Sequence, residues 1–217
     1  LKGETLPEIS EKHYAVFVGQ KAYNGVAILS DEPVTVQLTA LPGDDTDTQA
    51  RFLQATYRGL TLINIYLPNG NPVESEKFPY KLAWMERLYH HLKALRAKNI
   101  PFLIGGDFNV IPEPLDCYDP QIWANDALFR METRAKFRAL LGLGLTDALR
   151  VHNPGAHTYT FWDYQAGAWQ RGNGIRIDHF LLSPPVTDRL ISCTIDTAPR
   201  GLERASDHTP IIMEIEG

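Results

Sequence analysis

The stretch that decides the fold is FLIGGDFNVIP, residues 102–112. Its apolar beginning follows Pro101 and predicts a short buried strand. Gly105 and Gly106 end the apolar run, and glycine lets the backbone turn sharply or approach a ligand closely. We therefore expect a buried strand whose end opens directly onto a surface where chemistry can take place.

Asp107 and Asn109 follow this strand, with Phe108 between them. In an extended segment, residues 107 and 109 point to the same side and Phe108 points into the core. A carboxylate can bind a hard cation or accept a proton from water, and an amide can donate and accept hydrogen bonds. The pair therefore suits a site for an anionic substrate and a metal. An Asx-turn, in which both side chains only cap the backbone, explains the stretch equally well.

The segments on either side of this strand indicate an α/β fold. Residues 76–98 and 132–141 have the apolar spacing of helices, and 120–125 predicts a shorter one. The apolar stripe of the first helix is expected to comprise Phe78, Leu82, Met85, Tyr89, Leu92 and Leu95. Strands that precede and follow each helix indicate a single domain, residues 1–217, in which a mixed sheet sandwich is flanked by helices. The predicted strands are 14–19, 25–30, 34–39, 50–57, 60–66, 158–164, 175–183, 190–197 and 209–216.

Composition limits the class of protein. The 217 residues carry 21 Lys and Arg against 26 Asp and Glu, a balance that argues against binding nucleic acid by bulk charge. This charge balance remains compatible with an enzyme that has an acidic centre and a local basic rim. Cys117 and Cys193 make no disulfide framework, so a cytoplasmic protein is expected. No apolar run approaches the roughly 20 residues of a membrane span, so no membrane partner is expected.

A second polar cluster is predicted around Asp178, which interrupts the apolar run IRIDHFLLS. A buried carboxylate is costly unless it is partnered, and His208 in the sequence SDH is the expected partner. A histidine held by a carboxylate is fixed in tautomer and protonated more easily, and could stabilise charge on phosphate oxygens. A simple turn before a strand is the alternative explanation for Asp207 and His208. Tyr66 could likewise donate a hydrogen bond to a phosphate or only pack.

The segment YTFWDYQ concentrates aromatic residues. Strand alternation would place Tyr159, Phe161 and Asp163 on one face and Thr160, Trp162 and Tyr164 on the other. One face could form core while the other stacks on a sugar or base.

Taken in order, seven segments resemble the exonuclease III family, the AP endonuclease branch of the endonuclease/exonuclease/phosphatase superfamily. They are YNGVAILS, ARFLQATY, INIYLPNG, FLIGGDFNVIP, YTFWDYQ, GNGIRIDHFLLS and SDHTPI. TFWDY before RIDHFLLS is similar to the DNA-repair branch rather than to sphingomyelinases or inositol phosphatases. The resemblance implies a four-layer α/β/β/α sandwich of two mixed sheets flanked by helices. It also implies cleavage of DNA phosphodiesters that depends on Mg²⁺, with Mn²⁺ as a substitute. The expected partner of this monomeric enzyme is double-stranded DNA with abasic sites or 3′ ends.

The resemblance also implies roles for individual residues. Asp107 would orient or deprotonate the attacking water, and Asn109 would hydrogen-bond the nucleophile or transition state. Tyr66 would contact the phosphate, and His208, held by Asp178, would contact a non-bridging oxygen. Water would attack in line, with a metal neutralising phosphate charge.

Further positions follow from the same resemblance. Asp207 would be a metal ligand together with Asp107 and Asn109. Phe161, Ile175 and Ile177 would form the pocket for a flipped-out abasic sugar. The complete set of expected DNA contacts is Asn24, Gly25, Arg51, Phe161, Trp162, Ile175, Arg176 and Ile177.

The beginning of the chain departs from the family pattern. Family members open with a strand, a helix and a second strand that ends in the glutamate serving as principal metal ligand. LKGETLPE, residues 1–8, is similar to the segment after that glutamate. The expectation is therefore an N-terminally truncated chain without that strand–helix–strand and without that ligand. Two alternatives follow: a catalytically impaired or non-catalytic DNA-binding remnant, and another phosphodiesterase of the superfamily.

Overall fold

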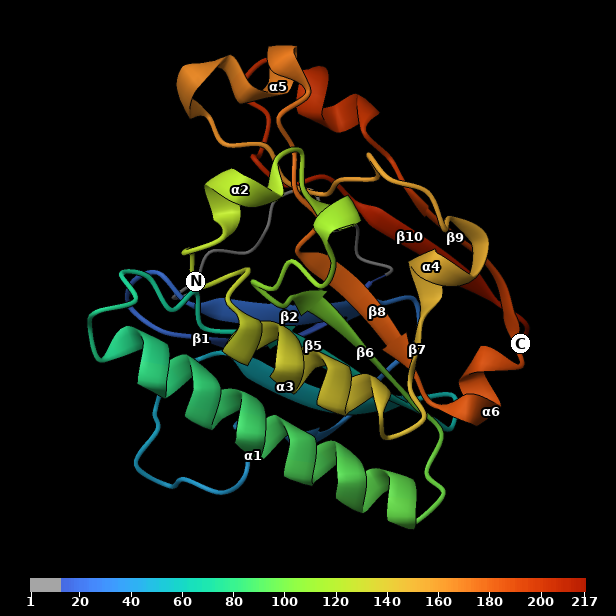
Figure 1. The fold of residues 1–217 in the computed structure, drawn as a ribbon. Coiled ribbons are helices and arrows are strands. Elements are labelled where there is room, and N and C mark those ends of the chain that lie inside the picture. The colour runs from blue at the N-terminus through green and yellow to red at the C-terminus, as the bar shows by residue number, and fades with distance from the viewer. Residues whose placement is uncertain (1–12) are drawn as a thin grey trace.

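The computed structural model describes residues 13–217, and its centre is a six-stranded mixed sheet with the order β3-β4-β5-β6-β8-β7 (Figure 1). β5 and β6 are parallel, and the other neighbouring strands are antiparallel. The stretch that opened the sequence forms β6, in the middle of this sheet. The strands are β3 Thr35–Leu38, β4 Phe52–Tyr57, β5 Leu60–Tyr66, β6 Phe102–Asp107, β7 Thr146–Asp147 and β8 Asp178–Leu182.

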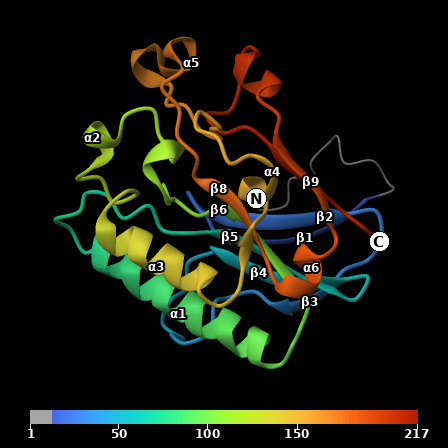
Figure 2. The same cartoon turned by 45° about the vertical axis from the view of Figure 1, so that its right-hand side comes forward.

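Two helices cover one face of this sheet, α1 (Lys77–Ala97) and α3 (Met131–Leu141) (Figures 1 and 2). Their apolar side chains share one core cluster with side chains of β4, β5 and β6. Burial of this apolar area is the main source of stability of the layer, at about 25 cal/mol per Å². The helix layer therefore holds the central strands from below in the view of Figure 1.

Two antiparallel strand pairs lie against the other face. β1 (Tyr14–Gly19) pairs with β2 (Gly25–Ser30), and β2 contacts β4 and β5. β9 (Leu190–Ile195) pairs with β10 (Ile211–Ile215), and this pair shares a core cluster with residues of β5, β6 and β8. The predicted α/β class, a mixed sheet flanked by helices, is confirmed. In the described residues, the second sheet layer consists of these two separate pairs. Residues 1–8, on which the truncation was argued, lie outside the described part.

Short helices occupy the connections between strands. Within residues 13–217, no helix is long and apolar enough to cross a membrane. The short elements are η1 Pro114–Asp116, α2 Pro120–Trp123, α4 Ala148–His152, η2 Gln165–Gly167, α5 Ala168–Arg171, α6 Pro184–Thr187 and η3 Ala198–Gly201.

The aromatic segment 158–164 is not the regular strand that was predicted. Phe161 forms isolated bridges with Ile175 and His208, and the predicted strand over 175–183 begins only at Asp178. The predicted alternation is also wrong, because Tyr159 and Trp162 are both buried and their ring centroids lie 6.1 Å apart. The segment links separate elements instead of joining one sheet.

The buried stripe of α1 differs from the prediction at several positions. Leu82 and Tyr89 are only half-buried. Lys81 is fully buried at 0% exposure, although lysine is the residue type least expected there. The buried residues of α1 are Phe78, Lys81, Trp84, Met85, Leu88, Leu92 and Leu95.

Candidate active site

Three neighbouring strands bring their polar residues to one edge of the sheet. Asp107 at the end of β6 is in register with Tyr66 of β5 on one side and with Asp178 of β8 on the other. These three residues and His208 line an open cavity of about 460 Å³, together with Asn64. The sheet register therefore assembles residues that are more than a hundred positions apart in the sequence.

Asp107 and Asn109 lie together because of a turn, not because the chain is extended. Asn109 has φ 48°, and its backbone N–H donates to Oδ1 of Asp107 at 2.8 Å. Its side-chain amide donates to Oδ2 of Asp107 at 3.0 Å. Phe108 points into the core, as predicted. The Asx-turn considered as the alternative is thus formed, and it is also what holds the carboxylate in place.

The two glycines of this stretch are required by close packing. A Cβ on Gly105 would lie 2.5 Å from the Phe180 ring. Gly106 has φ +130°, and a Cβ there would lie 2.1 Å from the carbonyl oxygen of Ile65. Because β5 approaches this closely, the turn after β6 can begin immediately beside Tyr66.

His208 and Asp178 form the predicted pair, with Nδ1 of His208 2.9 Å from Oδ2 of Asp178. Burial alone would lower the pKa of His208, but the hydrogen bond and charge of Asp178 outweigh it and raise the pKa to about 9. Phe161 packs edge-on against the imidazole, with ring centroids 5.0 Å apart. The imidazole is therefore oriented on two sides and positively charged at neutral pH.

Asp107 has the opposite electrostatic character. Burial, together with the nearby charge of Asp178, raises the pKa of Asp107 well above its usual range, and His208 opposes this only in part. A carboxyl group with such a pKa can exchange a proton with water near neutral pH. The site thus combines a proton acceptor and a fixed cation at one edge of the sheet.

Two residues that sequence reasoning missed support the Asp107–Asn109 turn. Asn69 donates from Nδ2 to Oδ1 of Asn109 at 3.0 Å. The ammonium of Lys81 donates to the carbonyl oxygens of Asn69, at 3.0 Å, and of Asn109, at 2.5 Å. Burial lowers the pKa of Lys81 to about 7. The sequence could have indicated the burial of Lys81, because this residue lies three positions after Phe78 and four before Met85, within the apolar stripe of the helix.

Part of the expected DNA-contacting set lies along one rim of the cavity. Arg51 is stacked over the ring of Tyr66 at 4.8 Å and donates to the Tyr66 carbonyl at 3.1 Å. Gln49 accepts hydrogen bonds from Arg51 at 2.7 Å and from Asn24 at 3.2 Å. Gly25 lines the cavity itself. Asn24, Gly25 and Arg51 are therefore mutually held beside Tyr66.

Arg176 and Trp162 do not fit the DNA-contacting role expected of them. Arg176 is 1% exposed, and its guanidinium donates to Asp116 at 2.6 Å and to Asp147 at 2.8 Å. Trp162 is 5% exposed and packs in a small aromatic cluster with Tyr159. Burial keeps both side chains away from any ligand at the surface, so the structure corrects these two assignments.

The expected sugar pocket is only partly assembled. Phe161 and Ile175 line a second cavity of about 270 Å³ next to His208. Ile177 is 3% exposed and packs in the core beneath it without lining the cavity. Phe161 and Ile175 therefore remain predicted pocket walls, and Ile177 supports them from behind.

The described residues do not fit a complete metal site. Within residues 13–217, no group of three His, Cys, Asp or Glu side chains is placed to hold an ion. The Asn109 amide is already engaged by Asn69, Leu67 and Asp107. Asp207 contributes negative charge near His208 but does not line the cavity. The described residues alone therefore offer at most part of the ligand set of a metal ion.

Fold and site define an α/β protein with an acid–amide turn and a carboxylate-held histidine at the carboxyl edge of its central parallel strands. The model of the Endonuclease/Exonuclease/phosphatase family matches residues 3–208. The chain belongs to this family. Exodeoxyribonuclease III of Haemophilus influenzae is 34% identical over 96% of this chain and 84% of the relative.

Solved structures agree with this assignment. An AP endonuclease from Archaeoglobus fulgidus superposes with a TM-score of 0.89 and 38% identity, covering 95% of this chain and 80% of the other. A 3′ phosphatase from Neisseria, bound to a product DNA hairpin, has a TM-score of 0.87 and 39% identity, with the same coverage.

Proposed function

We propose that this protein is a DNA-repair phosphodiesterase, a hydrolase that cleaves DNA phosphodiester bonds. The observation that carries the proposal is the convergence of Asp107, held by Asn109, and the Asp178–His208 pair around one open cavity beside Tyr66. Relatives with this fold are named for exodeoxyribonuclease, AP endonuclease and 3′ phosphatase activities. All three activities attack a phosphate ester of DNA.

The residues of the site suggest a division of roles. Asp107 accepts the proton of the attacking water, because its raised pKa makes it a suitable base near neutral pH. The protonated His208 donates to a non-bridging phosphate oxygen, where negative charge develops. The hydroxyl of Tyr66 provides an uncharged hydrogen bond to the water or phosphate, and Asn109 holds the Asp107 carboxylate in place.

The substrate within this class is proposed to be double-stranded DNA with abasic sites or 3′ ends. The chain is proposed to act as a monomer in the cytoplasm. A divalent cation, Mg²⁺ or Mn²⁺, is proposed as cofactor from the resemblance, with Asp107 and Asp207 as partial ligands. Such an ion would neutralise phosphate charge when bound. Its other ligands would have to come from water, from DNA or from outside residues 13–217.

The test uses the 217-residue chain with two labelled duplexes, one carrying a single abasic analogue and one a recessed 3′ end. Products are resolved on a denaturing gel with Mg²⁺, with Mn²⁺ and with EDTA. Metal-dependent incision or trimming that is lost in Asp107→Ala supports the proposal. Cleavage of a phospholipid or an inositol phosphate, with both DNA duplexes left intact, would assign the chain to another branch of the superfamily.

The alternative of a non-catalytic DNA-binding remnant is favoured by one observation, the incomplete ligand set among the described residues. It predicts retention of the abasic duplex in an anisotropy assay together with no product at any metal concentration. Turnover that disappears in Asp107→Ala rules it out, because binding alone does not require that carboxylate.

A further inference from the structure

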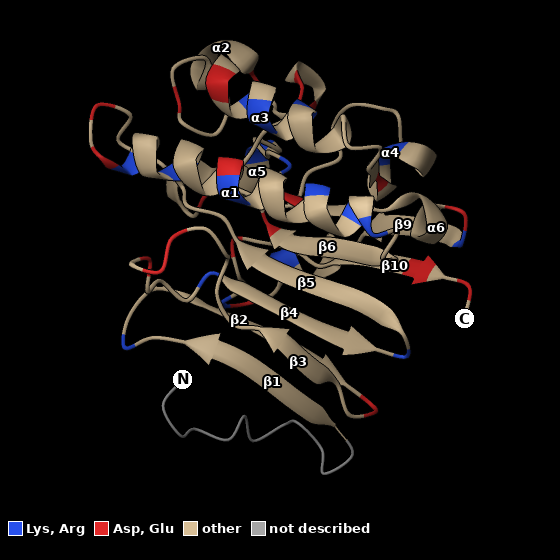
Figure 3. Ribbon diagram, turned by 90° about the horizontal axis from the view of Figure 1, so that it is seen from below, with Lys and Arg blue, Asp and Glu red and all other residues tan. Residues whose placement is uncertain are grey.

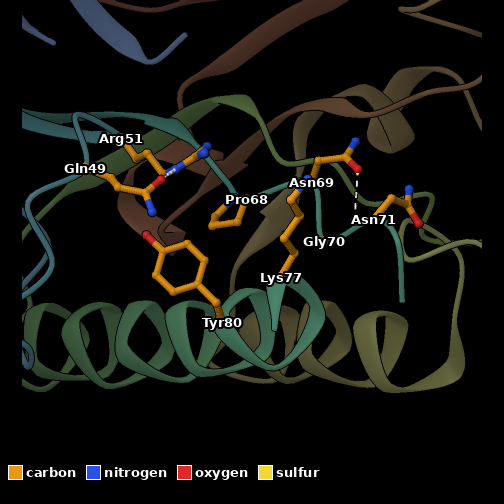
Figure 4. Close-up of a pocket in the computed structure, with 8 residues that line it drawn as sticks. All are labelled: Gln49, Arg51, Pro68, Asn69, Gly70, Asn71, Lys77 and Tyr80. Carbon is orange, nitrogen blue, oxygen red and sulfur yellow. Dashed lines mark hydrogen bonds between the residues drawn. The ribbon is translucent and has the colours of Figure 1, made fainter. Parts of the chain in front are cut away.

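A second polar pocket, shown in Figure 4, lies outside the cavity of the candidate active site. It has a volume of about 410 Å³ and lies between the loop 68–71, the first turn of α1 and the start of β4. The side chains that give it its chemistry are Gln49, Arg51, Asn69, Asn71, Lys77 and Tyr80. Arg51 connects the two sites, because it lines this pocket while stacking on the ring of Tyr66.

The pocket carries positive charge and unused hydrogen-bond donors. Within residues 13–217, Lys77 and Arg51 make no ion pair, and no carboxylate lines the pocket. Three donors have no partner among these residues: Nζ of Lys77, Nη2 of Arg51 and Nε2 of Gln49. By contrast, Arg87 on the same helix is bound to Asp47 at 2.6 Å. The nearby Asp47 is therefore neutralised, and it also accepts from the Tyr80 hydroxyl at 3.0 Å.

The walls of the pocket are held in place before any ligand arrives. Asn71 donates to both carboxylate oxygens of Asp126 at 3.1 Å. Gly70 lies so close to Lys81 that a Cβ would be 2.7 Å from its Cδ. Lys81 in turn bonds the carbonyl oxygen of Asn69. A site with fixed walls loses little conformational entropy on binding.

We propose that this pocket binds a phosphate group, and that its source is the DNA strand whose scissile phosphate occupies the neighbouring site. An arginine with one free nitrogen, a lysine and an amide N–H form a donor set suited to tetrahedral oxygens. The choice of DNA as source rests on the proposed function, whereas the affinity for a phosphate group does not. In the bound state, Arg51 links the phosphate of this pocket to Tyr66 at the reacting one.

The first experiment measures DNA binding by Lys77→Met, with Lys98→Met as the matched control on the far end of α1. Affinity for the abasic duplex is followed by fluorescence anisotropy in EDTA at several salt concentrations. We expect the dissociation constant to rise about five- to tenfold for Lys77→Met and to stay at the wild-type value for the control. The slope of log K against log salt should fall by about 0.9, the contribution of one phosphate contact.

A second experiment identifies the phosphate. Methylphosphonates, which are uncharged, replace the phosphates of the cleaved strand one at a time. A DNA phosphate in the pocket predicts one position at which the substitution weakens wild-type binding but has no further effect on Lys77→Met. A free phosphate as the true ligand predicts no such position. It predicts instead that inorganic phosphate, compared with chloride at equal ionic strength, raises the melting temperature of wild type but not of Lys77→Met.

These outcomes distinguish a failure of the phosphate pocket from a failure of the proposed function. Wild-type-like affinity and salt slope in Lys77→Met, with no Lys77-dependent effect of inorganic phosphate, would overturn the pocket assignment and leave the proposed function intact. A wild-type chain that binds no DNA would overturn the proposed function. In that case, the response to inorganic phosphate alone decides whether the pocket binds phosphate.

Discussion

At the scale of single residues, the site depends on side chains whose properties are set by their immediate neighbours. His208 stays protonated at neutral pH because Asp178 accepts its Nδ1–H. Asn109 is held by Asp107 and Asn69, and its carbonyl by Lys81. Removing one partner should therefore change chemistry more than stability.

Asp178→Asn tests the first of these dependencies. Without the Asp178 carboxylate, burial lowers the pKa of His208 with less opposition, so this pKa falls from about 9. We expect the rate of DNA cleavage to drop by about 10²- to 10⁴-fold and its alkaline limb to move to lower pH. A pH–rate profile from pH 6 to 10 measures both, with the exposed Asp188→Asn as control. An alkaline limb that stays in place would show that His208 does not act as the charged group.

Lys81→Met tests the buried ammonium. Methionine is of similar length and removes the cost of burying a charge, but it leaves two carbonyl oxygens without their donor. We expect turnover to fall at least about tenfold, because the Asn69 and Asn109 turns lose their common anchor. The free energy of unfolding should change by no more than about 2 kcal/mol. Steady-state kinetics and urea denaturation, with Lys98→Met alongside, separate this result from simple unfolding.

At the scale of elements, a buried polar network fixes the entry to β8. Arg176 joins Asp116 of η1 to Asp147 of β7, and its Nη1 donates to Nδ1 of His179 at 3.0 Å. His179 consequently carries its proton on Nε2 and donates it to the carbonyl of Val110 at 2.9 Å. The network connects the strand that carries Asp178 to the loop after Asn109. The network has a structural role, although Arg176 lies only two residues before Asp178 of the candidate active site.

Arg176→Met should therefore act on stability. Without Arg176, Asp147 loses its partner and Asp116 keeps only Arg150, so buried negative charge remains at a cost of about 3–5 kcal/mol. We expect this loss in urea denaturation, and DNA affinity of the folded fraction equal to that of wild type. The exposed Arg171→Met is the control. A large loss of affinity without a loss of stability would restore the DNA-contacting role.

His179 makes the fold sensitive to acid. Burial lowers its pKa to about 4, from about 6.5 in an unfolded chain. Because the folded pKa is the lower one, the associated stability is complete above pH 6.5 and is lost as the pH falls towards 4. The loss approaches about 3 kcal/mol at pH 4. Urea denaturation at pH 7 and pH 5 should show a smaller decrease for His179→Gln than for wild type.

At the scale of the whole molecule, charge is distributed unevenly. The chain has a formal net charge of −5, and charged residues of both signs lie over the helices and loops (Figure 3). Arg51 and Lys77 are nevertheless free of ion pairs on the rim of the site. DNA binding should thus depend on a few local contacts rather than on the overall field.

This distribution predicts a shallow salt dependence. With two to four phosphates neutralised, the slope of log K against log salt should lie between about −2 and −4. Anisotropy titrations over about a sixfold range of KCl concentration, roughly 50 to 300 mM, are sufficient to measure it. A slope much steeper than this would indicate an extended basic surface that the described residues do not form.

The sequence by itself determined the long helices and several of the core strands, but not the aromatic segment 158–164. Apolar spacing is a local property, so β5 has the predicted bounds and α1 differs from its prediction by one residue at each end. It also determined the Asp178–His208 pair, because a carboxylate inside an apolar run needs a partner wherever the chain goes. The resemblance to the family rested on the same local motifs.

Only the tertiary structure decided what each side chain faces. Lys81 and Arg176 are charged residues in apolar patterns, and their burial depends on carbonyl and carboxylate oxygens that lie 12 to 60 positions away. Phe161 is positioned by isolated β-bridges to Ile175 and to His208, and no alternation pattern in the sequence predicts these bridges. The polar pocket lined by Arg51 likewise forms only where the start of β4, the loop 68–71 and α1 meet. Local periodicity cannot specify such surroundings, because they are made by segments that become neighbours only in the folded chain.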